Sequence, residues 1–389
     1  MRRSTTVVLV VSLAILGIVA LGACGGTATT TTTPSTTATT AASTTTASGA
    51  TDTTGGTTET TWGAGFKPLD PAVKVTVAFD DAPGTAGLIL ADQMGFFKQV
   101  GIQVEWVKFN TGADMYTALA ANKVDVGRGI TTASLYNGAA QGVRVWVVAD
   151  SGTNVPGKPN YFGIVVRKDL ADQIKDYADL RGRNCLIVSK GSINERFLRL
   201  ALAKGGLTVD DVTVTIIDSF PDLNTALGNN AADVAVQIEP LITAGEKDDI
   251  FVRFAKDAQD YAAGQQVACL LYSDAFAKKA DVANAFMVAH LMGVRKYNDA
   301  VIHQKGNDMD AVIDLLAKNT FVQDPVMWTT MAPTGVDPDG TVLEKAVADD
   351  QQFYADIGMV QKTVPMTDVI DMSFAKYAVQ VLGAYEPPK

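Results

Sequence analysis

The chain has 389 residues, with 32 Lys and Arg against 42 Asp and Glu, which gives a formal net charge of −10. This length allows two or three domains with a sizeable core. The acidic balance disfavours nucleic acid as a partner, because binding phosphates requires clustered basic residues.

The first 23 residues have the features of a secretory signal peptide. Arg2 and Arg3 precede the apolar run Val7–Ala20, which is short for a transmembrane helix. The run leads into Leu-Gly-Ala-Cys at 21–24, the pattern of a bacterial lipobox, in which cleavage precedes a cysteine that becomes diacylated. Ordinary cleavage that leaves a free cysteine is the alternative. We expect lipidated Cys24 to anchor the mature protein on the extracytoplasmic side of a cell membrane.

Residues 24–71 are expected to form a disordered tether. From Gly25 to Thr61 the chain is almost entirely Thr, Ala, Ser and Gly, so it has little apolar surface to bury. A flexible segment of this length reaches roughly 30–37 Å. That reach is enough to hold a folded domain away from the membrane.

Strand and helix patterns alternate from Val73 onward. Apolar runs typical of buried strands, each followed by a polar turn, occur at Lys74–Phe79, Gln103–Phe109, Val124–Gly127 and Val143–Ala149. Helical patterns run through Leu88–Met94 and Ala113–Ala121, and a further helix opens near Ile130. This alternation predicts a parallel sheet with helices on both faces.

A second α/β unit follows the polar stretch Ser151–Asn160. Its expected strands are Phe162–Val166, Cys185–Val188, Val212–Ile217 and Val234–Ile238, with a short helix near Asp222–Leu227. The strand Val267–Tyr272 then returns to the first unit, and helical stripes follow at Val282–Tyr297, Met309–Leu316 and Val342–Tyr354. We predict lobe 1 at 72–165 plus 266–389 and lobe 2 at 166–265, with crossings near Val165 and Val267 that form a hinge beside a cleft.

The stretch Cys185–Leu198 combines a strand, a tight turn and a helix start. Ser192 and Glu195 have the spacing of a capping box, so the turn at Ser189–Ser192 is expected to present backbone N–H groups at the edge of a sheet. Small molecules bind at such edges in open α/β folds. Cys185 and Cys269 lie in apolar runs, and buried free thiols are favoured over a disulfide.

Several short stretches together resemble one protein family. They are Met94–Lys98, Gly101–Glu105, Ala118–Ala120, Lys123–Gly127, Asp179–Arg183, Ser189–Ser192, Ala232–Val236, Asp350–Tyr354, Ile357–Val360 and Ile370–Phe374. Their order resembles the nitrate/sulfonate/taurine and thiamine-pyrimidine-precursor type of ABC-transporter substrate-binding protein. The resemblance implies a type II periplasmic-binding-protein fold, with two α/β lobes, two hinge crossings and a helical C-terminal part. It also implies a monomer that closes on one small molecule and delivers it to ABC permease subunits.

In that family the turns at helix starts face the cleft. The resemblance therefore implies ligand contacts from residues in three such turns, namely Thr111, Gly112, Thr131, Thr132, Ser189, Gly191 and Ser192. Backbone N–H groups and hydroxyls suit the polar atoms of a ligand. For Thr111 and Ser192 the alternative is that each hydroxyl only caps its own helix.

Charged and aromatic residues near the strand ends bear on the ligand's chemistry. Asp80 and Asp81 would repel an anion, so they favour a ligand with positive charge or donor groups, such as an aminopyrimidine, a flavin-like heterocycle or an amine. Alternatively Asp81 caps the next helix and Asp80 points to solvent. Arg128 either pairs with these acids or binds a carboxylate or sulfonate. Tyr161 could stack on a flat ligand, and Glu239 either faces the cleft or is a turn residue.

Enzyme functions find little support in the sequence. His290 and His303 are the only histidines, and no metal, nucleotide or cofactor motif occurs. Fungal pyrimidine-precursor synthases share the implied fold but carry a cysteine-rich iron motif, whereas Cys185 and Cys269 stand apart here. We therefore expect a lipid-anchored solute receptor without metal or cofactor. A surface sensor or interaction protein that reuses the fold is the alternative.

Overall fold

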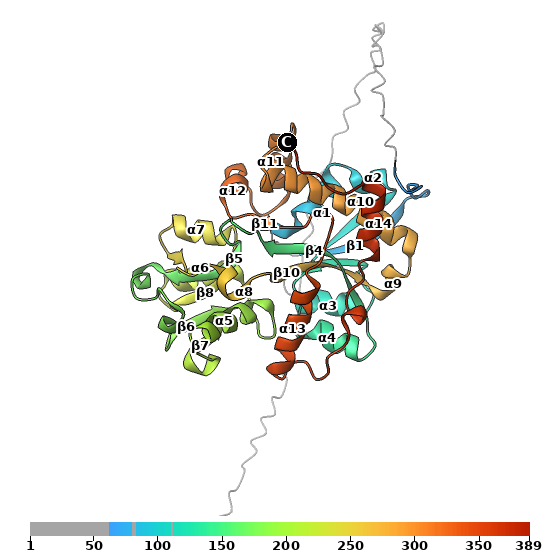
Figure 1. Ribbon diagram of the computed structural model, residues 1–389. Helices are drawn as coiled ribbons and strands as arrows, with labels where there is room; N and C mark the ends of the chain where they lie inside the picture. The colour runs from blue at the N-terminus through green and yellow to red at the C-terminus, as the bar shows by residue number, and fades with distance from the viewer. Residues whose placement is uncertain (1–61, 80–82, 110–111) are drawn as a thin grey trace, which may run out of the picture. The chain divides into compact units, whose positions relative to one another are not determined.

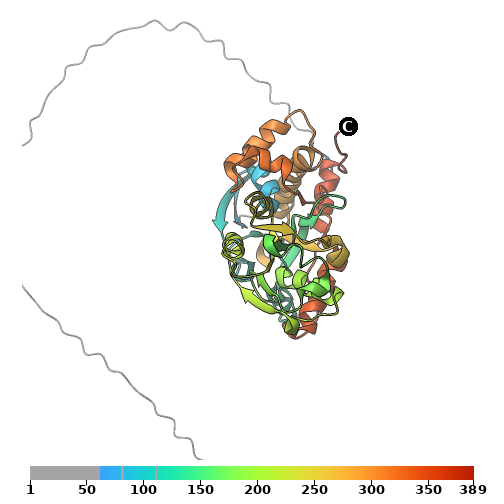
Figure 2. The same cartoon turned by 90° about the vertical axis from the view of Figure 1, so that its left-hand side faces the viewer.

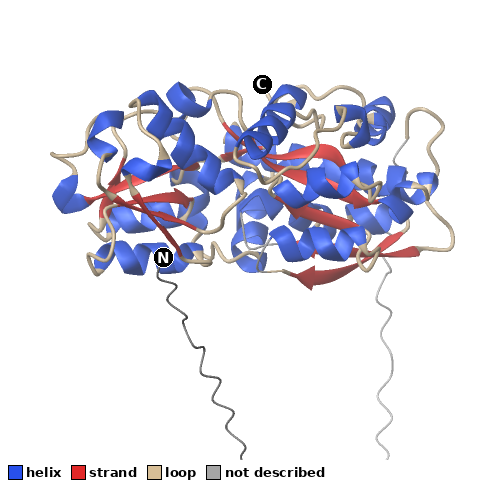
Figure 3. Ribbon diagram, turned by 90° about the horizontal axis from the view of Figure 1, so that it is seen from below, coloured by secondary structure: helices blue, strands red, loops and turns tan. Residues whose placement is uncertain are grey.

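The structure is a computed structural model that describes residues 62–79, 83–109 and 112–389 (Figure 1). The signal peptide, Cys24, most of the predicted tether, Asp80, Asp81 and Thr111 lie outside the described residues. Within that part no helix is both long and apolar enough to cross a membrane. Two sheets organise the described chain, and Figure 3 shows their strands between helices.

The larger sheet contains six strands. In spatial order they are β11 (Thr334–Gly335), β4 (Val145–Asn154), β10 (Gln266–Ser273), β3 (Val126–Gly129), β1 (Val73–Phe79) and β2 (Ile102–Lys108). β1 pairs in parallel with β2 and β3, whereas β10 runs antiparallel to both β3 and β4. The core strands β1 and β10 are rich in Val, Leu and Ala, as expected for strands covered on both faces.

Helices cover both faces of the larger sheet. One core joins the sheet to α1 (Ala86–Gln93), α2 (Phe96–Gln99), α10 (Ala280–Tyr297) and α14 (Ser373–Leu382). The core on the other face involves α3 (Gly112–Ala120), α4 (Ala133–Ala140) and α13 (Glu344–Asp356). α11 (Met309–Asn319) and α12 (Pro325–Thr330) add a helical layer beside α1 and α10, visible in orange in Figure 2.

The smaller sheet contains five strands. Their order is β7 (Thr213–Ile216), β6 (Asn184–Ile187), β8 (Val234–Ile238), β5 (Phe162–Arg167) and β9 (Phe251–Arg253). α5 (Ile193–Lys204) and α8 (Ala258–Ala262) pack on one face, and α6 (Phe220–Gly228) and α7 (Leu241–Lys247) pack on the other. β6 is parallel to β7 and β8, whereas β5 is antiparallel to β8 and β9.

Both sheets are mixed: the predicted parallel pairing is present, and antiparallel strands are added to it. The chain leaves the larger sheet along β4 and returns along β10, and these two neighbouring strands pair antiparallel. β4 also continues through Ser151 to Asn154, where the sequence suggested a polar break, because Thr153 pairs with Gln266 of β10 and with Gly335 of β11. The chain passes between the sheets at 155–161, and Val165 lies inside β5. The lobe division at 165 and 265 stays a prediction.

Both cysteines of the described region are buried and free, as predicted. Cys185 lies in β6 and Cys269 in β10, so they belong to different sheets. Burial raises the pKa of the Cys185 thiol to about 12, and it also raises the pKa of Cys269. Neither thiol is therefore available as a nucleophile at neutral pH.

Candidate functional site

Turns from the two sheets meet at the ends of parallel strands. Thr132 follows β3 and precedes α4, while Ser192 follows β6 and precedes α5, and these two residues form an antiparallel bridge. The Ala133 N–H donates to the carbonyl oxygen of Gly191 at 3.4 Å. The start of α3 also lies beside Thr132, because a Cβ on Gly112 would lie 3.7 Å from the methyl carbon of Thr132. The structure thus brings together Gly112, Thr132 and Ser192.

Gly191 is required by the geometry of its turn. Its φ of +63° lies in the left-handed region that favours glycine. A Cβ at this position would also lie 2.5 Å from the terminal methyl carbon of Met359, which follows α13. Any larger residue would therefore strain the backbone, and the flexible Met359 side chain would have to move aside.

The predicted capping box at Ser192 does not form, although the helix begins where expected. The Ser192 hydroxyl donates to the carbonyl oxygen of Ser189 at 2.9 Å. Glu195 accepts instead from the N–H of Gly191 at 2.8 Å and from the Arg199 side chain at 2.8 Å. Asn194 closes the turn, because its side-chain oxygen accepts from the Val188 N–H. The Ser192 hydroxyl thus stabilises the turn itself and not the first turn of α5.

A buried carboxylate lies behind these turns. Asp350 of α13 accepts from the Thr131 hydroxyl at 2.8 Å, from the Arg196 guanidinium at 2.7 Å and from the Gln265 amide at 3.0 Å. The side chains of Asp350 and Arg196 are only 0% and 9% exposed. Arg196 belongs to α5 on the smaller sheet, so this ion pair connects elements of the two sheets. Neither charged residue was predicted to contact the ligand, although Asp350 begins one of the stretches that carry the family resemblance.

Burial and pairing act on Asp350 in opposite directions. Burial raises the pKa of its carboxyl group above the ordinary value, while Arg196 and the hydrogen bonds from Thr131 and Gln265 lower it. Asp350 in turn adds to the effect of burial in raising the pKa of Tyr136 and of Tyr354. Among the described residues, no group of three or more His, Cys, Asp or Glu side chains could hold a metal ion.

Glu239 and Tyr161 lie side by side at the end of the smaller sheet. The Glu239 N–H donates to the carbonyl oxygen of Tyr161 at 2.8 Å, and both residues are buried. The Glu239 carboxylate accepts from the backbone and hydroxyl of Thr243, from the Arg253 guanidinium and from the Ala332 N–H. These contacts give Glu239 a structural part in joining segments, and its ligand role stays a prediction.

Arg128 is buried inside β3, at 2% exposure. Its guanidinium donates to the Ser151 hydroxyl at 3.2 Å and to the Ser151 carbonyl oxygen at 2.9 Å. A Cβ on Gly84 would collide with this guanidinium, and one on Gly152 would lie 2.7 Å from the Tyr161 hydroxyl. Arg128 and Tyr161 therefore lie close together beside the first crossing.

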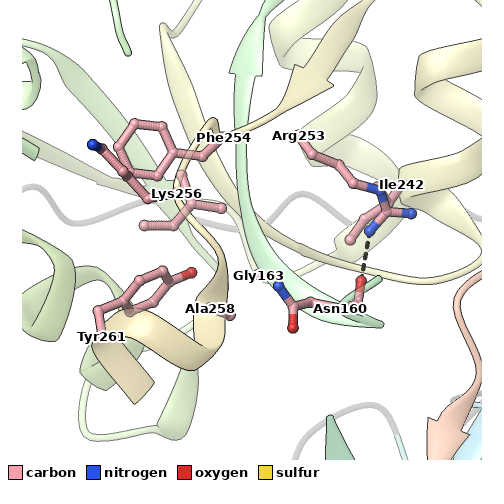
Figure 4. Close-up of a pocket in the computed structure, with 9 residues that line it drawn as sticks. Asn160, Gly163, Ile242, Arg253, Phe254, Lys256, Ala258 and Tyr261 are labelled. Atoms are coloured by element: carbon pink, nitrogen blue, oxygen red, sulfur yellow. Dashed lines mark hydrogen bonds between the residues drawn. The ribbon is translucent and has the colours of Figure 1, made fainter. Parts of the chain in front are cut away.

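A small cavity near the start of β5 is too small for an organic ligand. Its volume is about 20 Å³, which suits a single water molecule. Figure 4 shows Arg253, which donates to the Asn160 carbonyl oxygen at 2.5 Å, and the rings of Phe254 and Tyr261 around this space. None of the predicted ligand residues lines it.

The chain is similar in sequence and in structure to known proteins. The NMT1/THI5-like family model matches residues 82–306. A Bacillus subtilis (strain 168) protein named "Putative aliphatic sulfonates-binding protein" is 27% identical over 306 residues, which cover 75% of this chain and 85% of that protein. The ligand-binding component of an ABC-type import system from Staphylococcus aureus, solved with zinc bound, matches with a TM-score of 0.64 at 16% identity, over 79% of this chain and 99% of that one.

The same fold also occurs in an enzyme. The desulfurization enzyme DSZB matches with a TM-score of 0.56 at 17% identity, over 78% of this chain and 99% of that one. At such identities the structural matches concern the fold alone. Together they confirm the predicted periplasmic-binding-protein fold of two α/β lobes.

Proposed function

The chain belongs to the NMT1/THI5-like family, and from this membership we propose that it is the solute receptor of an ABC importer. The observation that carries the proposal is the meeting of strand-end turns from two sheets, Thr132 with Ser192 and Ala133 with Gly191. Opening of the lobes would free the backbone groups that these turns now share with each other, so that both turns can contact one small molecule. The receptor delivers that molecule to permease subunits as a monomer.

The two crossings between the sheets serve as the hinge. One runs from β4 to β5 through 155–161, and the other enters β10 at Gln266. A ligand that touches both lobes stabilises the closed arrangement over the open one, because only the closed arrangement makes both sets of contacts. The closed surface is what the permease recognises. This mechanism is supported by the contact between the Thr132 turn of one lobe and the Ser192 turn of the other.

Two ligand chemistries compete, and each has its own support. A sulfonate is supported by the name of the Bacillus subtilis relative and by the buried guanidinium of Arg128. A cationic or donor-rich heterocycle is supported by the neighbouring carboxylates of Asp80 and Asp81 in the sequence. We propose the amine-bearing heterocycle. Two adjacent carboxylates at a strand end repel an anionic ligand more strongly than one arginine attracts it.

Replacing Asp80 and Asp81 by alanine tests this choice directly. Affinity for a 4-aminopyrimidine should fall by about tenfold or more, since each lost charge contact weakens the binding of a donor-rich ligand. Titration calorimetry with aminopyrimidines and short alkanesulfonates measures both chemistries in one series. Asp310→Ala, at an exposed position on α11, is the control and should change neither affinity. Tighter sulfonate binding by wild-type protein would assign the site to anions instead.

Cys24 is proposed as the lipid anchor, which keeps the receptor near its permease. Cys24→Ala should abolish labelling by a fatty-acid analogue and move the protein from the membrane fraction to the soluble fraction. The matched control is Cys185→Ala, which removes a buried thiol and should leave both readouts unchanged. Lipid labelling of the Cys24→Ala protein would contradict the assignment.

A catalytic role remains the second candidate, because DSZB has the same fold. In the described residues His290 is buried in α10, and both cysteine thiols are buried with raised pKa values, so neither thiol is an activated nucleophile. Mass spectrometry of small molecules retained by protein purified from its native host tests the two roles. Unaltered release of the retained compound supports the receptor, and its conversion supports an enzyme.

A further inference from the structure

A cavity of about 380 Å³ lies beside the two crossings. This volume is within the range of small-molecule sites. Its walls come from the end of β4 and the first crossing, from the segment that enters β10, and from the C-terminal half of the chain. The residues used below are Asp150, Gln265, Asn298, Asp337 and Thr341. We call this space the hinge cavity.

Two amide side chains contribute oxygen acceptors to the hinge cavity. The Asn298 nitrogen donates to the carbonyl oxygens of Val294 at 2.9 Å and Val336 at 3.0 Å. The Gln265 nitrogen donates to the Gln266 carbonyl oxygen and to Asp350. Because both nitrogens are committed, each amide can offer only its oxygen, and neither oxygen accepts a hydrogen bond from the described residues. Both side chains are 5% exposed.

Two carboxylates add negative charge to the same wall. Asp150 is 2% exposed and accepts only from neutral donors in the described chain, namely the N–H groups of Gly152 and Asp337 and the amide of Gln266. Asp337 accepts from the N–H groups of Asp339 and Thr341 through one oxygen. No Lys, Arg or His occurs among the described residues that line the cavity. Burial raises the pKa of Asp150 to about 6, so its unpaired charge is present at neutral pH.

We propose that the hinge cavity binds a small organic molecule that carries amino groups, at a site separate from the turns where Thr132 meets Ser192. Ammonium groups supply hydrogen-bond donors and positive charge, and the cavity wall presents acceptors and negative charge. None of the residues predicted to contact the transported solute lines this cavity.

The hinge cavity is placed so that a bound molecule would contact both crossings of the hinge. Val155 and Pro156 belong to the first crossing, and Gly264 and Gln265 precede β10 in the second. A molecule that contacts both crossings binds one hinge arrangement better than another, and this difference shifts the balance between open and closed lobes. The site is therefore regulatory in character.

Putrescine and its uncharged counterpart butanediol test the proposal by titration calorimetry on the full mature chain. Putrescine should bind and butanediol should not. Asp337→Asn should weaken putrescine binding by about tenfold, because it removes one charge while keeping the oxygen that accepts from Asp339 and Thr341. Thr341→Trp, at an exposed rim position, should fill the cavity and abolish binding. Asp314→Asn on α11 is exposed, lies outside the cavity and should change nothing.

The proposal is overturned by a lack of putrescine binding, by equal binding of butanediol, or by an Asp337→Asn affinity equal to that of wild type. The Asp80→Ala/Asp81→Ala protein separates this site from the solute site. It should bind putrescine as wild type does, and a loss of binding there would assign the amine to the solute site.

Discussion

Replacing Asp350 by alanine should destabilise the folded protein by about 3–5 kcal/mol, because it leaves a buried guanidinium without its counter-charge. Arg196 is almost completely buried, and its Nε already lacks a partner within the described residues. The Thr131 hydroxyl and the Gln265 amide would also lose their acceptor. Chemical denaturation measures the change in the free energy of unfolding.

Part of the loss should appear as opening of the lobes, since the ion pair joins α5 on the smaller sheet to α13 on the larger one. Small-angle scattering of the Asp350→Ala protein should then give a larger radius of gyration than that of wild type. Separation of the lobes would let water reach Arg196. Hydration of the guanidinium would then reduce the free-energy cost of losing its carboxylate partner.

Asp349 supplies the matched control for this experiment. It is the neighbour of Asp350 on α13, but it forms an exposed ion pair with Lys345, with side-chain exposures of 44% and 87%. Asp349→Ala should therefore cost about 1 kcal/mol or less. The double variant Asp350→Leu with Arg196→Met should recover much of the stability, because it removes both buried charges. Equal stability and scattering for the Asp349→Ala and Asp350→Ala proteins would contradict the role assigned to this pair.

Local sequence signals predicted most of the strands and helix starts. The strand Val234–Ile238 was predicted with the bounds that β8 has, because a continuous apolar run between polar turns is characteristic of a buried strand. β4 was predicted to end at Ala149, but pairing with β10 and β11 extends it to Asn154. Polar residues join a strand there because neighbouring strands supply their hydrogen bonds, which sequence composition does not reveal.

The candidate site was predictable only in part, for the same reason. Turns such as Thr131–Thr132 and Ser189–Ser192 follow from strand ends and helix starts, which are local features. The pairing of Arg196 with Asp350 joins positions 154 residues apart, so the sequence around either residue does not indicate its partner. One signal was present, because Arg196 lies between the buried residues Ile193 and Phe197 of α5. A charge within an apolar helical stretch needs a buried partner.

Replacing His290 by leucine should stabilise the protein, which is unusual for a core substitution. His290 is 1% exposed in the middle of α10, and neither ring nitrogen has a hydrogen-bond partner among the described residues. A buried donor or acceptor without a partner costs about 1–3 kcal/mol, and leucine of similar size removes that cost while favouring the helix. The free energy of unfolding should rise by about that amount at neutral pH, as chemical denaturation would measure.

The gain should grow as the pH falls. Burial lowers the pKa of His290 from 6.5 to about 3, so the unfolded chain binds a proton that the folded chain refuses between these values. The free energy of unfolding is therefore undiminished by His290 titration above pH 6.5, and it decreases as the pH falls from 6.5 towards 3. The loss amounts to about 2 kcal/mol at about pH 5, and His290→Leu abolishes it.

His303 provides the comparison, because it is exposed and stacks on Tyr385 at 6.3 Å between ring centroids. His303→Gln should shift stability at neutral pH by no more than about 0.5 kcal/mol. If the curves of unfolding free energy against pH for wild type and His290→Leu run parallel between about pH 7.5 and about pH 5, His290 does not stay neutral in the folded core. Its ring nitrogens must then have partners when the protein is in solution, because only a stabilised imidazolium would titrate like an exposed one.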